Sequence, residues 1–331
     1  MQAIVFDAFG GPEVLVSREV ERPCARPHDL LVANASIGVN RADISHRKGA
    51  YGRAHFGDSD IMGLEIAGTV VELGSQVRGY AVGDRVMGIV GGGAYAEFSR
   101  IDHRMAMRVP PGLALADAGA VAEVFVTAHE ALFHLARLQA GETVLIHAAA
   151  GGVGSAAVQL AHAAGARVFA TAGGDKRHAV HGFGADEVID YRTEDFQNVV
   201  DQKTDGKGVD VVIDFIGAPY LERNVRSLAV GGRMVVVGLL GGTQGAALPL
   251  DALLYRHLQI FGTVMKSRSP EVKQAMTQRF AQRWLEALAA GAIRPVIDST
   301  FALADAADAH RRMESGESVG KILLIPATAA H

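Results

Sequence analysis

The sequence predicts an α/β protein that combines an irregular β-rich part with a doubly wound parallel sheet. Up to about residue 120, short apolar runs alternate with glycine-containing turns, which is typical of strands in an irregular β domain. Beyond that point, apolar runs alternate with alanine- and leucine-rich segments, as expected for parallel strands buried on both faces and separated by helices. A glycine-rich turn joins the first of these strands to a helix.

Composition is that of a globular protein large enough for two domains. The chain has 331 residues, of which 49% are hydrophobic and 21% charged. Its formal net charge of -4 offers no basic surface for a nucleic acid, so we expect no such partner. The single cysteine, Cys24, excludes an intrachain disulfide and fits a reducing compartment.

No segment of the sequence resembles a secretory leader or a membrane span. The first residues lack a basic leader followed by an apolar core. The most apolar stretch, residues 144–164, carries two histidines and is broken by glycines. We therefore expect a cytoplasmic protein without a membrane partner.

The β-rich part contains five segments with strand character. They are residues 3–6, 30–40, 67–74, 84–90 and 94–101. The tail adds a helix over 272–291, which Gly291 closes, and a final strand over 321–326. Because one helix and a lone strand cannot form a domain, we expect the tail to return to the N-terminal part. The first domain is thus predicted over residues 1–120 and 266–331.

The second domain is predicted over residues 121–265 and carries the parallel sheet. Its expected strands are residues 143–148, 167–172, 187–190, 209–217, 232–238 and 258–264, with a helix over 155–165 after the first of them.

The turn after the first parallel strand has the pattern Ala148-x-x-Gly151-x-x-Gly154 and leads directly into the helix. Glycines there permit a tight turn and a close approach of the backbone to a pyrophosphate, while the helix N-terminus supplies free N–H groups. Ala149 replaces the first glycine of the strict dinucleotide-binding pattern. Since strand, turn, helix and next strand all agree, the segment predicts a dinucleotide site.

The end of the next strand indicates which coenzyme is bound. An NAD-binding sheet places a carboxylate about 20 residues beyond the glycine motif, and residues 171–173 offer none. Lys176, with Arg177 behind it, is placed to meet a 2′-phosphate, and Tyr191 could donate a hydrogen bond to it. These residues favour NADPH. Asp175 leaves NAD possible as the coenzyme, although this residue could also be only a helix cap. Lys176 and Arg177 could likewise belong only to a solvent-exposed helix face.

Read with several further motifs, these residues resemble the medium-chain dehydrogenase/reductase superfamily. Within it the sequence is most similar to the zinc-free, zeta-crystallin-like quinone oxidoreductases, especially the tumour-suppressor-inducible NADPH quinone oxidoreductase branch. The ordered motifs that carry the resemblance are Gly10-Gly11-Pro12-Glu13, Asn40-Arg41-Ala42-Asp43, Gly49-x-Tyr51, Gly63-Leu64-Glu65, Gly91-Gly92-Gly93-x-Tyr95-Ala96-Glu97, Asp214-x-x-Gly217, Gly238-Leu239-x-Gly241-Gly242, Lys266-Ser267-Arg268-Ser269 and Gly320-Lys321.

The resemblance implies a GroES-like catalytic domain, a Rossmann domain and a set of residues that bind NADPH. The implied cofactor residues are Asn40, Thr127, Ala150, Gly151, Gly152, Val153, Gly173, Lys176, Tyr191, Ile216, Gly217, Gly238, Leu239, Leu240 and Lys321. Ordinary structural roles remain open for several of them. Asn40 with Asp43, or Thr127, could simply cap helices, and the glycines could be plain strand ends.

A catalytic zinc is not expected. By the resemblance, Asn40 stands where zinc-dependent relatives have a cysteine, and Leu64 stands where they have a histidine ligand. His129-Glu130 with His134 is not the H-E-x-x-H zinc motif, because its histidines are five residues apart. We read both histidines as helix-surface or core residues.

Without a metal to polarise a carbonyl, the site suits acceptors that are already electron-poor, so we expect hydride transfer to a quinone. Tyr51 and Asn40 are the candidate catalytic residues. The Tyr51 phenol could donate a hydrogen bond or a proton to the developing oxyanion, or it could only stack on the substrate.

Two other functions remain open at this point. The first is reduction of the double bond of an enone, alkenal or enoyl thioester. The second is an NADPH-binding scaffold or sensor with negligible turnover. We also expect a homodimer, because relatives pair the edge strand predicted over residues 258–264 across a two-fold axis.

Overall fold

The structure, a computed structural model, describes residues 1–50, 59 and 61–327, which divide into two compact units. The first unit comprises Met1–Val126 and Pro270–His331, and the second comprises Thr127–Ser269. Domain boundaries after residues 120 and 265 remain the prediction of the sequence. The α/β class, with a β-rich part and a parallel-sheet part, is confirmed.

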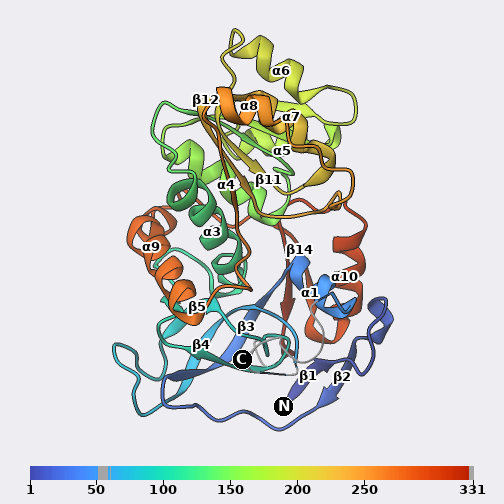
Figure 1. The fold of residues 1–331 in the computed structure, drawn as a ribbon. Coiled ribbons are helices and arrows are strands. Elements are labelled where there is room, and N and C mark those ends of the chain that lie inside the picture. The colour runs from blue at the N-terminus through green and yellow to red at the C-terminus, as the bar shows by residue number, and fades with distance from the viewer. Residues whose placement is uncertain (51–58, 60, 328–331) are drawn as a thin grey trace. The chain divides into compact units, whose positions relative to one another are not determined.

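The first unit is built on a seven-stranded sheet with the order β14-β15-β3-β4-β5-β7, in which β6 also pairs with β3 (Figure 1). Its strands are β3 (Asp29–Val39), β4 (Glu65–Leu73), β5 (Arg85–Ile89), β6 (Phe98–Asp102), β7 (Ala106–Arg108), β14 (Ile297–Ala302) and β15 (Lys321–Ile325), and β1 (Gln2–Val5) pairs separately with β2 (Val16–Glu19). Its helices are α1 (Arg41–Arg47), α2 (Leu115–Ala118), α9 (Pro270–Ala289) and α10 (Ala306–Glu314).

The C-terminal tail returns to this sheet. β15 lies antiparallel to β3, with Ile322 opposite Val39, and β14 pairs parallel to β15. Helix α10 packs against both tail strands, as Figure 1 shows in red. The beginning of β15 therefore lies beside the end of β3, which leads into α1.

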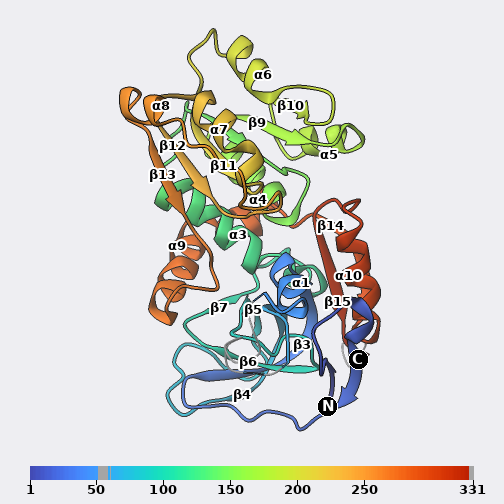
Figure 2. The same cartoon turned by 45° about the vertical axis from the view of Figure 1, so that its right-hand side comes forward.

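The second unit contains a six-stranded parallel sheet with the order β10-β9-β8-β11-β12-β13 (Figure 2). Its strands are β8 (Thr143–Ile146), β9 (Arg167–Ala172), β10 (Glu187–Asp190), β11 (Val209–Asp214), β12 (Leu228–Val236) and β13 (Gln259–Gly262), and its helices are α4 (Gly152–Ala163), α5 (Arg177–Gly182), α6 (Phe196–Lys203), α7 (Leu221–Ser227) and α8 (Leu250–Tyr255). Helix α3 (Ala122–His129) runs across the division between the units and continues as a π-helical turn, Glu130–Leu135.

Both sheets bury apolar residues where the sequence pattern placed them. In the second unit, Leu145, Phe169 and Ile189 of three adjacent strands pack against Phe196 of α6 and Val225 of α7. Burial of apolar surface contributes a free energy of about 25 cal/mol per Å². Such a cluster therefore stabilises the packing of the helices on the sheet.

Some elements differ from the prediction. The strand expected over 209–217 ends at Asp214, because Gly217 adopts a φ of 88°, which extended strands do not have. Strands β2, β7 and β14 were not predicted. Within the part of the chain that the structure describes, no helix is both long and apolar enough to cross a membrane.

Candidate functional site

The glycine turn after β8 leaves no room for a side chain at Gly154. Ala148 adopts a positive φ of 46°, and the Gly151 N–H donates to the Ala148 carbonyl at 2.9 Å. A Cβ at Gly154 would lie 2.3 Å from that same carbonyl oxygen. The turn brings α4 to begin at Gly152, where the first N–H groups of a helix have no partner within it. An anion such as a pyrophosphate fits this end of the helix. Ala150 and Val153 lie on either side of Gly151 and Gly152, and their contact with the cofactor remains a prediction.

The ends of β9 and β10 lie side by side, because Ala172 is in register with Asp190. The next residues, Gly173 and Tyr191, therefore stand at the same edge of the sheet. A Cβ at Gly173 would lie 2.7 Å from Asp175 Oδ1 and 3.1 Å from Arg192 Cζ. Arg192 Nη1 donates to Asp175 Oδ1 at 3.2 Å, so the carboxylate that left NAD open already has a cationic partner.

The two basic residues beside Asp175 have different surroundings. Lys176 is half-buried at the end of a 3-10 turn, Gly174–Lys176, and remains a predicted phosphate contact. Arg177 instead turns towards β10: its Nε and Nη2 donate to Val188 O at 2.9 and 2.6 Å, and Nη2 lies 3.0 Å from Glu194 Oε2. Arg177 therefore holds α5 against β10, and its expected position behind Lys176 at a 2′-phosphate remains a prediction.

Asp214 is the last residue of β11 and lies opposite Val236, the last residue of β12. This buried carboxylate accepts hydrogen bonds from Ile216 N at 2.9 Å and Gly217 N at 3.0 Å, and burial raises its pKa to about 6. Gly217 is required by its positive φ and by a neighbour, since a Cβ would lie 2.8 Å from Gly242 O. The predicted residues Gly238, Leu239 and Leu240 follow β12, and both leucines are exposed. Thr127 lies inside α3 and is not a helix cap.

In the first unit, Asn40 is held by a buried lysine and a buried glutamate. Lys321 Nζ donates to Val39 O at 2.8 Å, to Asn40 Oδ1 at 2.6 Å and to Glu65 Oε2 at 2.8 Å. Asn40 Nδ2 donates to Gly38 O at 3.1 Å and to Glu65 Oε2 at 3.2 Å. Gly38 makes this packing possible, because a Cβ there would lie 2.1 Å from the Glu65 carboxylate. Glu65 was part of a motif but was not predicted as a site residue.

The Lys321 ammonium has three protons and three acceptors inside the first unit, so it acts there as the support of Asn40. Its assignment as a cofactor contact remains a prediction. The other oxygen of Glu65, Oε1, accepts from the Glu123 backbone N–H at 2.8 Å. Burial beside Glu65 raises the pKa of the Glu123 side chain to about 8.

A chain of hydrogen bonds runs behind α1. Asp43 Oδ2 accepts from Asn40 N at 2.8 Å and from the Tyr95 hydroxyl at 3.2 Å. The Tyr95 oxygen lies 2.9 Å from His310 Nε2, and His310 Nδ1 lies 3.1 Å from Arg47 Nη1. Because burial lowers the pKa of His310 to about 3 and arginine only donates, His310 is neutral: it accepts from Arg47 and donates to Tyr95. The Asp43 carboxylate therefore caps α1, which is the structural role that the sequence left open for Asn40 with Asp43.

The remaining residues singled out in the sequence add no further contacts to the site. Tyr51, the candidate proton donor, lies outside the described residues. His129 is buried, and His134 Nε2 is 3.9 Å from Glu130 Oε1. Across residues 1–50, 59 and 61–327, no group of three or more His, Cys, Asp or Glu side chains is arranged to hold a metal ion. Zinc-free chemistry remains a prediction.

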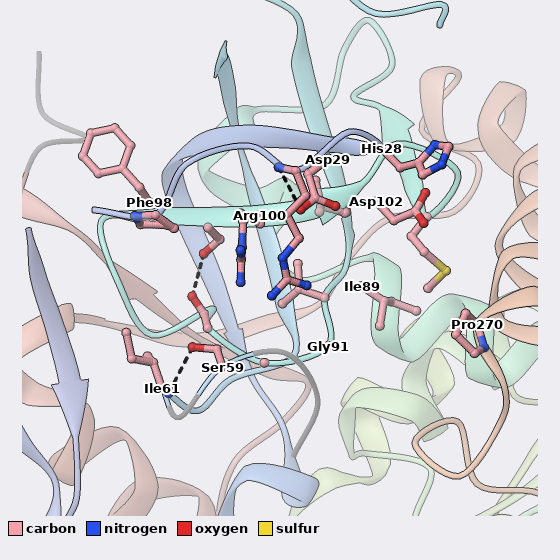
Figure 3. Close-up of a pocket in the computed structure, with 18 of the residues that line it drawn as sticks. His28, Asp29, Ser59, Ile61, Ile89, Gly91, Phe98, Arg100, Asp102 and Pro270 are labelled. Carbon is pink, nitrogen blue, oxygen red and sulfur yellow. Dashed lines mark hydrogen bonds between the residues drawn. The ribbon is translucent and has the colours of Figure 1, made fainter. Parts of the chain in front are cut away.

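A cavity of about 520 Å³ lies within the first unit, lined in part by Arg100, Asp102, Ile89 and Phe98 (Figure 3). Figure 3 shows Arg100 pointing into it, and Ser59 on its wall accepts a hydrogen bond from Ile61 N at 3.1 Å. Among the predicted site residues that the structure describes, none lines this cavity.

Two family models match the chain. The alcohol dehydrogenase GroES-like domain matches residues 26–136, and the zinc-binding dehydrogenase model matches residues 152–282. Among curated proteins, a quinone oxidoreductase of Rattus norvegicus is 34% identical over 330 residues, which cover 98% of this chain and 98% of that protein. A mycocerosic acid synthase-like polyketide synthase of Mycobacterium tuberculosis is 34% identical over 90% of this chain but only 14% of the synthase.

Solved structures show the same likeness. The quinone oxidoreductase of Escherichia coli, complexed with NADPH, has a TM-score of 0.89 and 30% identity, covering 98% of this chain and 100% of that chain. An NAD-dependent alcohol dehydrogenase has a TM-score of 0.86 and 30% identity, covering 98% and 99%. The 34% identity to a quinone oxidoreductase over 98% of the chain and the two matched family models agree with the fold. The chain therefore belongs to the medium-chain dehydrogenase/reductase superfamily, in its quinone oxidoreductase branch.

Proposed function

We propose that this protein is a zinc-independent oxidoreductase that reduces quinones by hydride transfer from NADPH. The observation that carries the proposal is its full-length similarity to quinone oxidoreductases, one of which has been solved with NADPH. The glycine turn and the basic edge of the second unit support the same coenzyme.

The residues of the second unit fit a dinucleotide. The turn from Ala148 to Gly154 and the N-terminus of α4 would hold the pyrophosphate, since the glycines carry no side chain and the first N–H groups of a helix have no partner within it. Lys176 and Tyr191 would meet the 2′-phosphate at the edge formed by Gly173. When bound, NADPH supplies the hydride, and the protein's contribution is mainly to orient it.

Asn40 contributes a hydrogen-bond acceptor. Both of its amide N–H groups are directed to Gly38 O and Glu65, and Oδ1 accepts a hydrogen bond from Lys321. A ligand at Asn40 would therefore have to donate, as a carboxamide N–H or a hydroxyl does. Tyr51 is proposed to give a hydrogen bond or a proton to the reduced oxygen of the acceptor.

A double-bond reductase is the second candidate. The observation in its favour is that segments of polyketide synthases are as similar to this chain as the quinone oxidoreductases are. The NADPH scaffold is the third possibility and predicts binding without turnover.

An acceptor panel separates these functions. Loss of NADPH absorbance is measured with ortho- and para-quinones, enones and enoyl thioesters, and each product is identified. We expect turnover with quinones, a marked preference for NADPH over NADH, and a lower turnover number in Tyr51→Phe. Turnover with enoyl thioesters alone would replace the proposal by the second candidate, and tight NADPH binding without turnover would replace it by the third.

We further propose that two copies of the chain pair through β13 and that the protein works in the cytoplasm. β13 is the last strand of its sheet, and large apolar side chains near it are exposed, among them Leu250, Leu254, Tyr255 and Val264. A second copy would cover both the strand edge and these side chains. The cytoplasmic proposal rests on the single, exposed and unpaired cysteine, Cys24.

A further inference from the structure

We propose that Arg192 is the residue that lets the coenzyme site of the second unit accept a 2′-phosphate, and that its guanidinium exchanges Asp175 for this phosphate when the coenzyme binds. This inference deepens the proposed NADPH-dependent function and rests on it. It assigns a specificity role to a residue that the sequence pattern did not single out.

The position of Arg192 follows from the strand register. Asp190 pairs with Ala172, so the residues that follow β10 lie against those that follow β9. In dinucleotide-binding sheets, the end of the second strand is where an NAD enzyme carries the carboxylate that binds the ribose hydroxyls. Here that residue is Gly173, and a Cβ on it would lie 2.7 Å from Asp175 Oδ1, 3.1 Å from Arg192 Cζ and 3.2 Å from Arg192 Nη2. The Arg192–Asp175 pair thus stands where an NAD enzyme would carry a lone carboxylate.

The charged side chains around Gly173 explain why a 2′-phosphate would need the Arg192 guanidinium. Six charged side chains gather at the edge: three carboxylates and three cations, namely Asp175, Asp190, Glu194, Lys176, Arg177 and Arg192. Arg177 is committed to Val188 O and Glu194. Without Arg192, Lys176 alone would face a 2′-phosphate while Asp175 and Asp190 repelled it. Arg192 converts an edge that would reject the phosphate into one that binds it.

The ion pair between Arg192 and Asp175 is weak enough for Arg192 to exchange the carboxylate for a phosphate. The side chains are 57% and 59% exposed and share one contact of 3.2 Å, so the pair adds little stability. A phosphate dianion offers a guanidinium two parallel hydrogen bonds and a larger charge. The Arg192 Cζ also lies 5.8 Å from the Tyr191 ring centroid, which keeps the cation near the predicted phosphate contact. Arg192 can therefore leave Asp175 for the phosphate with little loss.

The test compares both partners of the pair. Dissociation constants for NADPH, NADH, 2′,5′-ADP and 5′-AMP are measured by calorimetry for the wild type, R192Q, D175N and the double variant. We expect R192Q to weaken NADPH and 2′,5′-ADP by about tenfold or more and to leave NADH and 5′-AMP nearly unchanged. D175N should bind NADPH as tightly as the wild type or more tightly. The double variant should recover part of the loss.

R226Q is the matched control, since Arg226 forms a similar exposed pair with Glu222 in the same unit, and it should bind like the wild type. If R192Q fails to fold, R192K is measured instead and should lose a smaller part of the NADPH affinity, because lysine keeps the charge but not the two-pronged geometry.

Two results would overturn the inference: wild-type NADPH affinity in R192Q, or equal losses of NADPH and NADH in both R192Q and D175N, as a merely structural pair would give. The proposed function fails differently. If the wild type binds 2′,5′-ADP through Arg192 but reduces no acceptor, the specificity role stands and the quinone reductase does not.

Discussion

Among single residues, Glu123 is held in an environment that disfavours its charged form. Its backbone N–H donates to Glu65, and its Oε2 is buried with no hydrogen-bond partner among the described residues. Burial, and then the negative charge of Glu65, raise the pKa of Glu123 to about 8. The folded protein therefore keeps this carboxyl protonated near neutral pH.

This raised pKa makes folding stability depend on pH. Unfolded, the group titrates near its ordinary value of 4.5, so the folded state binds the proton more tightly. The resulting stability is complete below pH 4.5 and is lost as pH rises through 8. We expect the free energy of unfolding in urea to fall between pH 5 and 8, and to fall less steeply in Glu123→Gln.

A part of the slope should persist in that variant, because burial also raises the pKa of Asp43, to about 7. The exposed Glu19 provides the control: Glu19→Gln should keep the wild-type pH dependence. An unchanged slope in Glu123→Gln would show that its carboxyl ionises freely in the folded protein.

Among the elements, the turn between β8 and α4 depends on a glycine at one position more than at the other. A Cβ at Gly154 would lie 2.3 Å from the Ala148 carbonyl oxygen, whereas a Cβ at Gly151 would lie 3.3 Å from it. Gly154→Ala must therefore displace backbone, which costs about 1–3 kcal/mol. We expect it to lower the free energy of unfolding by that amount and to weaken NADPH binding by about tenfold.

Gly151→Ala is the matched control, since its φ of -76° suits any residue and its closest contact needs only a small adjustment. It should unfold close to the wild type. Equal losses of stability in the two variants, measured by chemical denaturation, would contradict a steric role specific to Gly154.

At the level of the whole molecule, the sequence predicted what is local and repeated. The strands of the second unit were recognised because each is a continuous apolar run, and the coenzyme turn because its glycines follow such a run. Contacts between distant positions carry no such signal. Lys321 meets Glu65 only because β15 pairs with β3, and Arg192 reads as an ordinary surface charge until the register of β9 and β10 places it over Gly173.

Strand β2 was missed for a different reason. Its four residues are all exposed, so they show no apolar alternation that could identify a strand. The end of β11 was placed three residues too far for another reason. Its apolar run continues to Ile216, and the close approach of Gly217 to Gly242 O is a contact that the local sequence does not reveal.

The proposed assembly of two copies is tested through Val264, which is 47% exposed just beyond β13. Sedimentation of the wild type should give twice the mass of one chain. Val264→Glu places like charges across the proposed two-fold axis and should shift the protein towards the monomer. Val82→Glu, at an exposed valine of the first unit, should sediment like the wild type. A monomeric wild type would refute pairing through this edge.

The return of β15 to β3 also sets an order of events on the ribosome. The second unit is contiguous and is fully translated once Ser269 has been added, whereas the first unit waits for its last strand. At about 5–20 residues per second, Lys321 follows within seconds. Until then Glu65 lacks its ion pair with Lys321, and Asn40 Oδ1 lacks the hydrogen bond that Lys321 donates. A chain terminated before Lys321 would thus be released with a complete second unit and an unfinished first unit.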